Sequence, residues 1–524
     1  MRLSKNLPVL LLCAALLLGL FPAAGVTAAA ADGVTYYVDS AAGDDANSGT
    51  SENEAWKTLQ KASSVTYGAG DRILLKRGGY FQGGFSAKGS GSADAPVTLS
   101  VYGEGAMPVI TNAPDDPQCR PVLEFVDVSH WTATDLELNA PNGTGVYIAF
   151  NGEMVEDITV DSLVIHNIQN YPSDDYYAGQ RAAVRIMGNS GAKYIYAKDI
   201  NILNCEIYDC GYGIFTSSHF YDESPNCEEY PYSKDILVDG CSIHDLYDDG
   251  IIIAQVERMV VRNTSVINTT QSNGIYFTAP TWMWGATNCV VENCEIAGAK
   301  NLKDGMACDF DDHTDNSVYQ YVYSHDNVRF MHNCPFNDDH YNNTVRYCLS
   351  VNDNLTRNGA GRGDDIPERN FKFYNNTIIN GGEYFFDRFE DSYICNNIFC
   401  LQPGQTIHHL KNRNNVVSNN CYYGVFLSTC QDSSPVRADP RFAGSALDDP
   451  DSFVLLSSSP CIGAGVAVED DMGERDFYGN PLTETHNIGC YEGGGAEGEY
   501  RRDIFAYIRM FFRALIFWIG GTFR

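Results

Sequence analysis

The stretch LNCEIYDCGYGIF (residues 203–215) decides the fold, because its pattern recurs along the chain. It holds two short alternations of apolar and polar residues, separated by an Asn with a small residue and followed by a Gly turn. Equivalent stretches include DGCSIHDLYDDGIII (239–253), VENCEIAGAKNLKDGMACDF (291–310) and FYNNTIING (373–381). The corners of the repeat lie 21 to 36 residues apart and are predicted at Asn204, Gly240, Asn263, Asn293, Tyr323, Tyr347, Asn376, Asn397 and Asn420.

A repeat of this length, made of short strands and turns without helical periodicity, is typical of a parallel β-solenoid. Each coil stacks about 4.8 Å above the last, and the inward side chains of all coils form one continuous core. The sequence therefore predicts an all-β fold in which the strands of successive coils pair in parallel.

The cysteines allow two interpretations. Seventeen are present, and sixteen remain once the expected signal peptide, which contains Cys13, is removed. An even number in an exported chain permits a disulfide framework. Several of them instead occupy one position of the repeat, which favours a ladder of small buried thiols. The predicted ladder consists of Cys205, Cys241, Cys294, Cys348 and Cys421.

The charge of the chain restricts its partners. With 35 Lys and Arg residues against 67 Asp and Glu residues, the formal net charge is −32. This argues against nucleic acid as a partner. It also weighs against a polyanionic sugar chain, unless calcium or a local basic cleft offsets the repulsion.

The two ends of the chain differ from its body. Residues 1–31 are interpreted as a cleaved signal peptide, because Arg2 and Lys5 precede a short apolar run that ends in small residues. Residues 493–500 are predicted to be a flexible Gly-rich linker, and residues 501–524 a basic amphipathic helix suited to a membrane interface. A secreted monomer is expected, with retention at the outer face of the membrane or cell surface as the alternative.

Segments at both ends of the repeat carry a resemblance. The opening TYYVDSAAGDDANSGTSENEAWKTLQKASS (35–64) and the closing DPRFAG (439–444), SSSPCIGAG (457–465) and DFYGNPLTETHNIGCYE (476–492) resemble secreted right-handed parallel β-helix proteins of carbohydrate metabolism. That group includes pectate-lyase-like proteins and several glycoside hydrolases. The resemblance implies a single-stranded right-handed parallel β-helix with an N-terminal cap helix and a C-terminal cap. The expected segments are an N-terminal cap with the first coils (32–112), the β-helix (113–438) and the C-terminal cap (439–492).

The strand after Gly305 predicts which way its aspartates point. Alternate strand residues face opposite sides, so an inward Met306, Cys308 and Phe310 place Asp309 and Asp311 on the outer face. By the same rule an inward position is predicted for Phe277 on a neighbouring coil. The outer face and its bordering loops supply the substrate-binding candidates: Tyr147, Arg185, Phe215, His219, Tyr276, Trp282, Trp284 and Arg388. Trp282 and Trp284 are expected on a loop.

Asp309 and Asp311 are the leading catalytic candidates. Two residues apart on one strand, their Cα atoms are about 6.6–6.8 Å apart. Carboxyl groups so placed reach either the spacing of retaining or that of inverting glycosidases, and the sequence leaves both open. Asp387 and His325 are further catalytic candidates, although His325 recurs at a coil position that also suits a turn-stabilising stack.

Two acidic segments are weaker candidates for calcium. Asp312 and Asp315 follow the aspartate pair, and Asp44, Asp45 and Asn47 lie in the opening loop. Both segments offer the oxygen ligands that Ca²⁺ prefers, but a plain polar loop is the favoured interpretation of the second. No cofactor is expected to be required, and calcium stays open.

Three functions are compatible with these residues. The first is a glycoside hydrolase that acts on a poly- or oligosaccharide through Asp309 and Asp311. The second is a calcium-dependent polysaccharide lyase in which Arg185 or Lys303 removes the proton. The third is a non-catalytic surface protein whose solenoid only binds glycans.

Overall fold

The computed structural model describes residues 33–112, 120–168, 181–188, 192–218, 231–271, 277–334, 341–353, 355–358, 368–385, 389–402, 405–408, 413–424, 426–427 and 432–498. The expected signal peptide and the expected C-terminal amphipathic helix lie outside these residues. Within them, no helix is long and apolar enough to cross a membrane.

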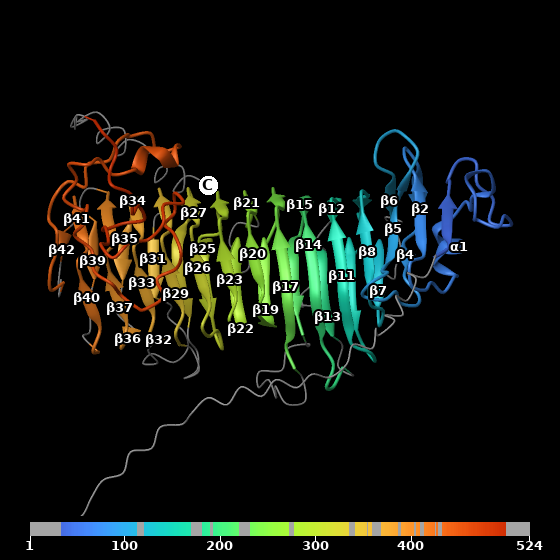
Figure 1. Ribbon diagram of the computed structural model, residues 1–524, viewed down its shortest axis with the longest axis horizontal. Helices are drawn as coiled ribbons and strands as arrows, with labels where there is room; N and C mark the ends of the chain where they lie inside the picture. The colour runs from blue at the N-terminus through green and yellow to red at the C-terminus, as the bar shows by residue number, and fades with distance from the viewer. Residues whose placement is uncertain are drawn as a thin grey trace, which may run out of the picture.

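The described chain is a parallel β-helix, an elongated stack of coils with three strands per coil (Figure 1). Equivalent strands of successive coils pair in parallel and form three ladders. The first and second ladders together make up a 27-stranded sheet, and the third is a separate 13-stranded sheet. The predicted all-β parallel fold is confirmed.

The first ladder carries the residues of interest. Its strands are β4 (Phe85–Ser86), β7 (Leu123–Val126), β10 (Val146–Phe150), β13 (Ala182–Gly188), β16 (Tyr212–Ser217), β19 (Ile251–Glu257), β22 (Thr281–Thr287), β25 (Met306–Asp311), β28 (Arg329–Cys334), β31 (Leu355–Asn358), β35 (Glu383–Phe385), β39 (Thr406–His408) and β42 (Phe426–Leu427).

The second ladder consists of β1 (Thr35–Val38), β2 (Arg72–Lys76), β5 (Val97–Tyr102), β8 (Trp131–Thr134), β11 (Val155–Asp161), β14 (Ala197–Leu203), β17 (Ser233–Asp239), β20 (Val260–Arg262), β23 (Val290–Glu292), β26 (Val318–Gln320), β29 (Thr344–Arg346), β33 (Lys372–Tyr374), β37 (Tyr393–Cys395) and β40 (Val416–Ser418). A short pair, β32 (Glu368–Arg369) and β36 (Phe389–Glu390), accompanies it.

The third ladder consists of β3 (Tyr80–Gln82), β6 (Val109–Thr111), β9 (Glu137–Asn139), β12 (Val164–Ile168), β15 (Glu206–Cys210), β18 (Ser242–His244), β21 (Ser265–Ile267), β24 (Glu295–Ala297), β27 (Tyr323–His325), β30 (Leu349–Val351), β34 (Thr377–Gly381), β38 (Ile398–Leu401) and β41 (Cys421–Tyr423). The described helices are α1 (Leu59–Ser63), near the N-terminal end of the stack, and two 3₁₀ turns, η1 (Glu52–Glu54) and η2 (Pro450–Phe453) (Figure 1).

The core fills the space between the three ladders. Strands alternate buried and partly exposed residues, so every second side chain of each coil joins one apolar column. Twelve of the described cysteines are free and buried, which confirms the thiol interpretation for them. Cys205, Cys241, Cys294 and Cys348 each follow a corner residue, as predicted.

Some predicted corners are wrong. Corner residues have positive φ. The prediction is correct for Asn204, Gly240, Asn263, Asn293 and Tyr347. The other corners lie instead at Tyr321, Asn375, Asn396 and Asn419. Asn376, Asn397 and Asn420 therefore take the inward position of the thiols. They are fully buried and bond to one another, with the N–H of Asn376 donating to Asn397 Oδ1 at 3.0 Å and that of Asn397 to Asn420 Oδ1 at 2.9 Å.

Cys421 accordingly does not belong to the thiol position. It pairs with Ile398, two residues beyond the corner asparagine, and so aligns with Leu349 three coils earlier. An asparagine has replaced the cysteine of earlier coils because its amide satisfies the corner backbone, donating from Asn420 Nδ2 to the carbonyl of Ile394 at 2.8 Å.

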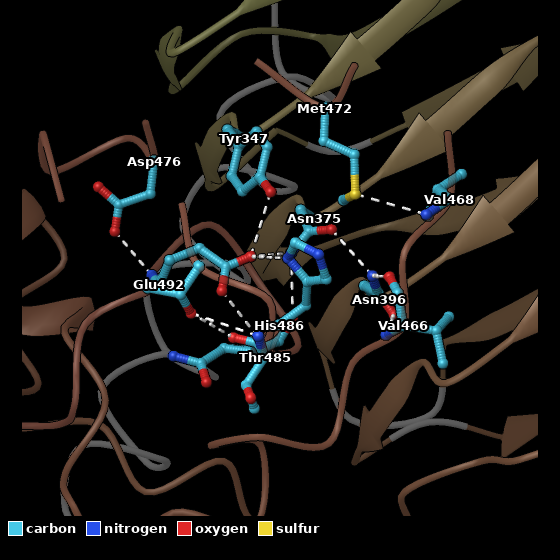
Figure 2. A network of polar contacts seen from close by, with 12 residues as sticks. Tyr347, Asn375, Asn396, Val466, Val468, Met472, Asp476, Thr485, His486 and Glu492 are labelled. Atoms are coloured by element: carbon cyan, nitrogen blue, oxygen red, sulfur yellow. Dashed lines mark hydrogen bonds and ion pairs between the residues drawn. The ribbon is translucent and has the colours of Figure 1, made fainter. Parts of the chain in front are cut away.

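Residues 432–498 fold back against the last coils (Figure 1). Glu492 holds them there: its Oε1 accepts hydrogen bonds from Tyr347 Oη and Asn375 Nδ2, both at 3.1 Å, and lies 3.4 Å from His486 Nδ1 (Figure 2). Burial raises the pKa of Glu492. The flexible linker expected at residues 493–500 stays a prediction; within its described part the N–H of Ala496 donates to the Leu455 carbonyl at 2.8 Å.

Candidate active site

A row of outward side chains runs along the first ladder. The pairing of successive strands aligns Glu124, Tyr147, Arg185, Phe215 and Ile252. The row continues through Trp282, which pairs with Ile252. Parallel strands keep equivalent residues on one face, so a single stripe links the early coils with the predicted aspartate strand.

Strand β25 brings the aspartates into this row. Met283 pairs with Phe310, and this register sets Trp282 beside Asp309 and Trp284 beside Asp311. On the other side Asp309 pairs with His332 of β28. Met306, Cys308 and Phe310 are fully buried in the opposite direction, as predicted. The outward orientation of both aspartates follows from this alternation.

Asp309 is only 4% exposed although it faces outward, so the expected open groove is wrong at this residue. Its Oδ1 lies 3.2 Å from Nδ1 of His332. Burial raises the pKa of Asp309 well above its ordinary value, and the charge of Asp304 raises it further, while Arg329 opposes the shift. Such a carboxyl group retains a proton at a pH where an exposed aspartate has lost it.

Asp311 is more accessible and titrates together with its neighbour. It is half-buried at the end of β25. Burial raises its pKa well above the ordinary value, and the charge of Asp309 adds to the effect, whereas His332 lowers it. Two carboxyl groups that repel each other lose their protons in separate steps. The charge of Asp309 therefore opposes the ionisation of Asp311.

Asp304 and Arg329 form the edge of the site. Asp304 lies in the turn before β25, and burial raises its pKa, with His332 and Arg329 opposing. The Arg329 guanidinium is 3.9 Å from Asp304 Oδ1 and donates to the carbonyls of Asp304 at 2.9 Å and Leu302 at 3.3 Å. These hydrogen bonds to backbone carbonyls fix the Arg329 side chain at the start of β28 and stabilise the turn that contains Asp304.

Asp249 supports Trp282 from the preceding coil. It is fully buried in the turn before β19, and its Oδ1 accepts hydrogen bonds from the N–H of Ala279 at 2.7 Å and from Trp282 Nε1 at 3.0 Å. Its Oδ2 has no hydrogen-bond partner among the described residues. Burial raises the pKa of Asp249 well above its ordinary value, and Asp248 and Asp304 add to the shift. The bond to Asp249 fixes the orientation of the indole beside Asp309.

Several predicted binding residues lie elsewhere than expected. Trp282 and Trp284 are half-buried on strand β22, so the prediction of a loop is wrong. Phe215 is 3% exposed within an apolar cluster, and its ring lies 5.3 Å from the Arg185 guanidinium carbon, so it is not an open platform for a sugar. Tyr147 is half-buried beside Arg185. His219, Tyr276, Asp387 and Arg388 lie outside the described residues.

His325 is on a different ladder from the aspartate pair. It lies on β27, where its imidazole contacts Glu295 and Asp326, each at 3.0 Å. Burial lowers its pKa, but these two carboxylates outweigh burial and raise it to about 9. The equivalent rings of His166, Tyr208 and His244 stack at 5.1 and 5.4 Å. Ile267 and Ala297 separate His325 from these stacked rings, and its place on another ladder gives a catalytic role no support beyond the prediction itself.

The acidic segments suggested for calcium have protein partners. Asp45 accepts hydrogen bonds from the N–H groups of Lys57 and Thr58 and from Thr58 Oγ1, Asp44 accepts one from Ala46, and Asn47 donates to Ala55. Asp312 lies 3.5 Å from His313, and Asp315 accepts a hydrogen bond from Tyr341. No group of three or more His, Cys, Asp or Glu in the described part of the chain is arranged to hold a metal ion.

Sequence reasoning missed Asp249, Asp304 and His332. Asp249 and Asp304 precede glycines and have the appearance of ordinary turn residues. A register extended from Asp309 to the next strand identifies His332, because the two residues pair directly.

Comparisons with known proteins agree with this fold. No family model matches the chain. A lacto-N-biosidase of Bifidobacterium longum subsp. longum is 25% identical over 88% of the chain, which spans 36% of the length of that relative. This chain is homologous to a lacto-N-biosidase.

A solved structure extends the comparison. A crystal structure of a GH136 lacto-N-biosidase from Eubacterium ramulus matches with a TM-score of 0.54 and 20% sequence identity, covering 77% of this chain and 67% of that one. Its selenomethionine derivative gives 0.52. The predicted resemblance to β-helix proteins of carbohydrate metabolism is confirmed.

Proposed function

We propose that this chain is a glycoside hydrolase whose catalytic carboxyl groups are Asp309 and Asp311. The observation that carries the proposal is their position: two outward carboxyl groups on one strand, both with raised pKa, beside Trp282 and Trp284. The homology to a lacto-N-biosidase supports the same reaction class.

The pair suits the two tasks of glycosidic bond hydrolysis. One protonated carboxyl group donates its proton to the leaving oxygen, while the ionised one attacks the anomeric carbon or removes a proton from the attacking water. Water supplies the hydroxyl group that ends on the released sugar, so the reaction consumes no other reagent. A burial-raised pKa keeps the acid protonated at a pH where an ordinary exposed aspartate has already ionised.

The neighbouring groups position this pair. His332 contacts Asp309 at 3.2 Å and offsets part of the upward shift in the pKa of Asp311. The charge of Asp304 raises the pKa of both aspartates. The indole of Trp282, fixed by Asp249, offers an apolar face on which the C–H surface of a pyranose ring can stack.

The lyase alternative is less well supported. Its proposed bases each contact an aromatic ring, since Arg185 is packed on Phe215 and the Lys303 ammonium lies 5.0 Å from the Phe277 ring. The substrate we propose is an oligosaccharide, and glycans with terminal lacto-N-biose are the first to test because the relatives are lacto-N-biosidases. We also propose secretion through residues 1–31, which N-terminal sequencing of the exported protein checks.

The test is turnover on a mixed panel of neutral and uronic-acid glycans. New reducing ends report hydrolysis, and ultraviolet absorbance of unsaturated uronides reports elimination. We expect reducing ends without absorbance, abolished by Asp309→Asn/Asp311→Asn. Asp199→Asn is the matched control, because Asp199 is exposed within β14 at a position of positive φ, which Asn also adopts. Absorbance without hydrolysis, or full activity of the double variant, contradicts the proposal.

A further inference from the structure

A cavity lies at the N-terminal end of the stack, away from the aspartate pair. It encloses about 600 Å³ between α1, β3, β4 and the start of β7. Its polar lining residues include Gln60, Gln82, Ser86, Lys88, Asn112 and Glu124. A volume of 300–1,000 Å³ is typical of small-ligand pockets, so about 600 Å³ is sufficient for a bound oligosaccharide unit.

Several lining groups have unused hydrogen-bonding capacity. The side chains of Gln60, Gln82 and Lys88 are exposed and have no hydrogen-bond partner among the described residues. Glu124 accepts a hydrogen bond from Ser86 Oγ at 2.8 Å through one carboxylate oxygen and leaves the other unbonded to described residues. Side-chain amides, an ammonium group and a carboxylate together present both donors and acceptors, which hydroxyl-rich ligands require.

Hydrogen bonds of a buried asparagine, Asn112, fix the wall of the cavity. Asn112 is 3% exposed, donates from Nδ2 to the Arg120 carbonyl at 3.1 Å and accepts from the N–H of Asn142 at 3.3 Å. Gly83 has φ of +96°, and a Cβ there would lie 2.5 Å from Gln60 Nε2. The glycine therefore allows the Gln60 amide to lie directly over the backbone at the cavity edge.

The cavity and the aspartate pair share one face of the β-helix. Glu124 pairs with Tyr147, which begins the outward row that leads through Trp282 to Asp309. Six coil steps of about 4.8 Å separate Glu124 from Asp309, a distance of about 29 Å along the stack. A sugar unit held in the cavity is therefore too far from the aspartate pair to contain the reacting bond, although it lies on the same stripe.

We propose that this cavity is a second carbohydrate-binding site, which takes a hydroxyl-rich saccharide segment without cleaving it. The amides of Gln60 and Gln82 and the free oxygen of Glu124 bind hydroxyl groups, and Lys88 adds a donor at the rim. The ligand class rests on the proposed function, but binding in the cavity does not require hydrolysis at Asp309.

The experiment measures binding stoichiometry by calorimetry on the full chain carrying Asp309→Asn/Asp311→Asn, which blocks turnover. The probes are neutral lacto-N-, cello- and xylo-oligosaccharides and an oligogalacturonate. We expect two sites for a neutral probe, of which Gln60→Ala/Gln82→Ala removes one or weakens it at least tenfold. Lys57→Ala/Glu104→Ala, at exposed positions outside the cavity lining, is the control and should leave both sites intact.

The outcomes separate the two proposals. Binding of the oligogalacturonate alone at the Gln60/Gln82 site supports an acidic saccharide as the ligand of the cavity. A single site that the Gln60→Ala/Gln82→Ala variant leaves unchanged, or no binding of any probe, overturns the inference even if the unaltered chain hydrolyses glycans. Two sites in a chain without hydrolytic activity support the cavity and contradict the proposed function.

Discussion

Asp309→Asn should inactivate the protein and stabilise it at the same time. Asn keeps an oxygen in place to accept from His332, which lies 3.2 Å from Asp309 Oδ1, so the contact can persist. The variant removes only the ability to ionise and to exchange a proton. General acid–base groups contribute about 10²–10⁴-fold to rate, and a loss of at least that size in kcat is expected.

The stability change follows from the direction in which the pKa moves. Burial raises the pKa of Asp309 above the value of about 3.9 that it has in the unfolded chain. The folded protein therefore binds this proton more tightly, and it loses stability as the pH rises from about 4 towards the folded-state pKa. Every tenfold increase in proton affinity on folding corresponds to about 1.4 kcal/mol of stability, which the variant regains at high pH because Asn does not ionise.

Thermal unfolding at pH 4 and pH 8, measured beside turnover, checks both effects. We expect Asp309→Asn to unfold at a higher temperature than the unaltered chain at pH 8 and at the same temperature at pH 4. Asp199→Asn, at an exposed position, should change neither property. A lower unfolding temperature for Asp309→Asn at pH 8, or a kcat equal to that of the unaltered chain, would refute these expectations.

Three further predictions concern neighbouring residues. His332→Ala should raise the pKa of Asp311 and move the acidic limb of the kcat profile to higher pH, because His332 lowers that pKa. Trp282→Phe should cost about 1–3 kcal/mol in urea unfolding, since it deprives the buried Asp249 of a hydrogen bond. Because the pKa of His325 is raised to about 9, its stabilisation of the fold should be complete below pH 6.5 and should be lost as the pH rises through about 9. Thermal unfolding of His325→Gln should lack this pH dependence.

Residues that repeat with the coil could be predicted from the sequence. Alternation after Gly305 correctly oriented Met306, Cys308 and Phe310 towards the core and Asp309 away from it. The same rule failed for Phe277, which is 65% exposed, because no described strand includes it. Local periodicity is informative only where the chain pairs with the neighbouring coil.

The surroundings of the aspartates were harder to predict. Asp249 and His332 reach Trp282 and Asp309 from neighbouring coils, so their positions depend on strand register rather than on local sequence. Burial of Asp309 results from the packing around the strand and not from its own alternation, which placed it outside. The sequence therefore indicated the catalytic candidates but not the groups that set their pKa values.

We expect Asp309 and Asp311 to perform the two carboxyl roles of glycoside hydrolysis. The decisive measurement is the rescue of Asp309→Ala and Asp311→Ala on a glycoside with a good leaving group. Added azide should restore turnover in the variant that lacks the nucleophile or base and yield a glycosyl azide. The variant that lacks the acid should cleave this activated substrate far better than an unactivated one. Undiminished turnover in both Ala variants on the unactivated glycan, or no response to azide or leaving group in either, would contradict these roles.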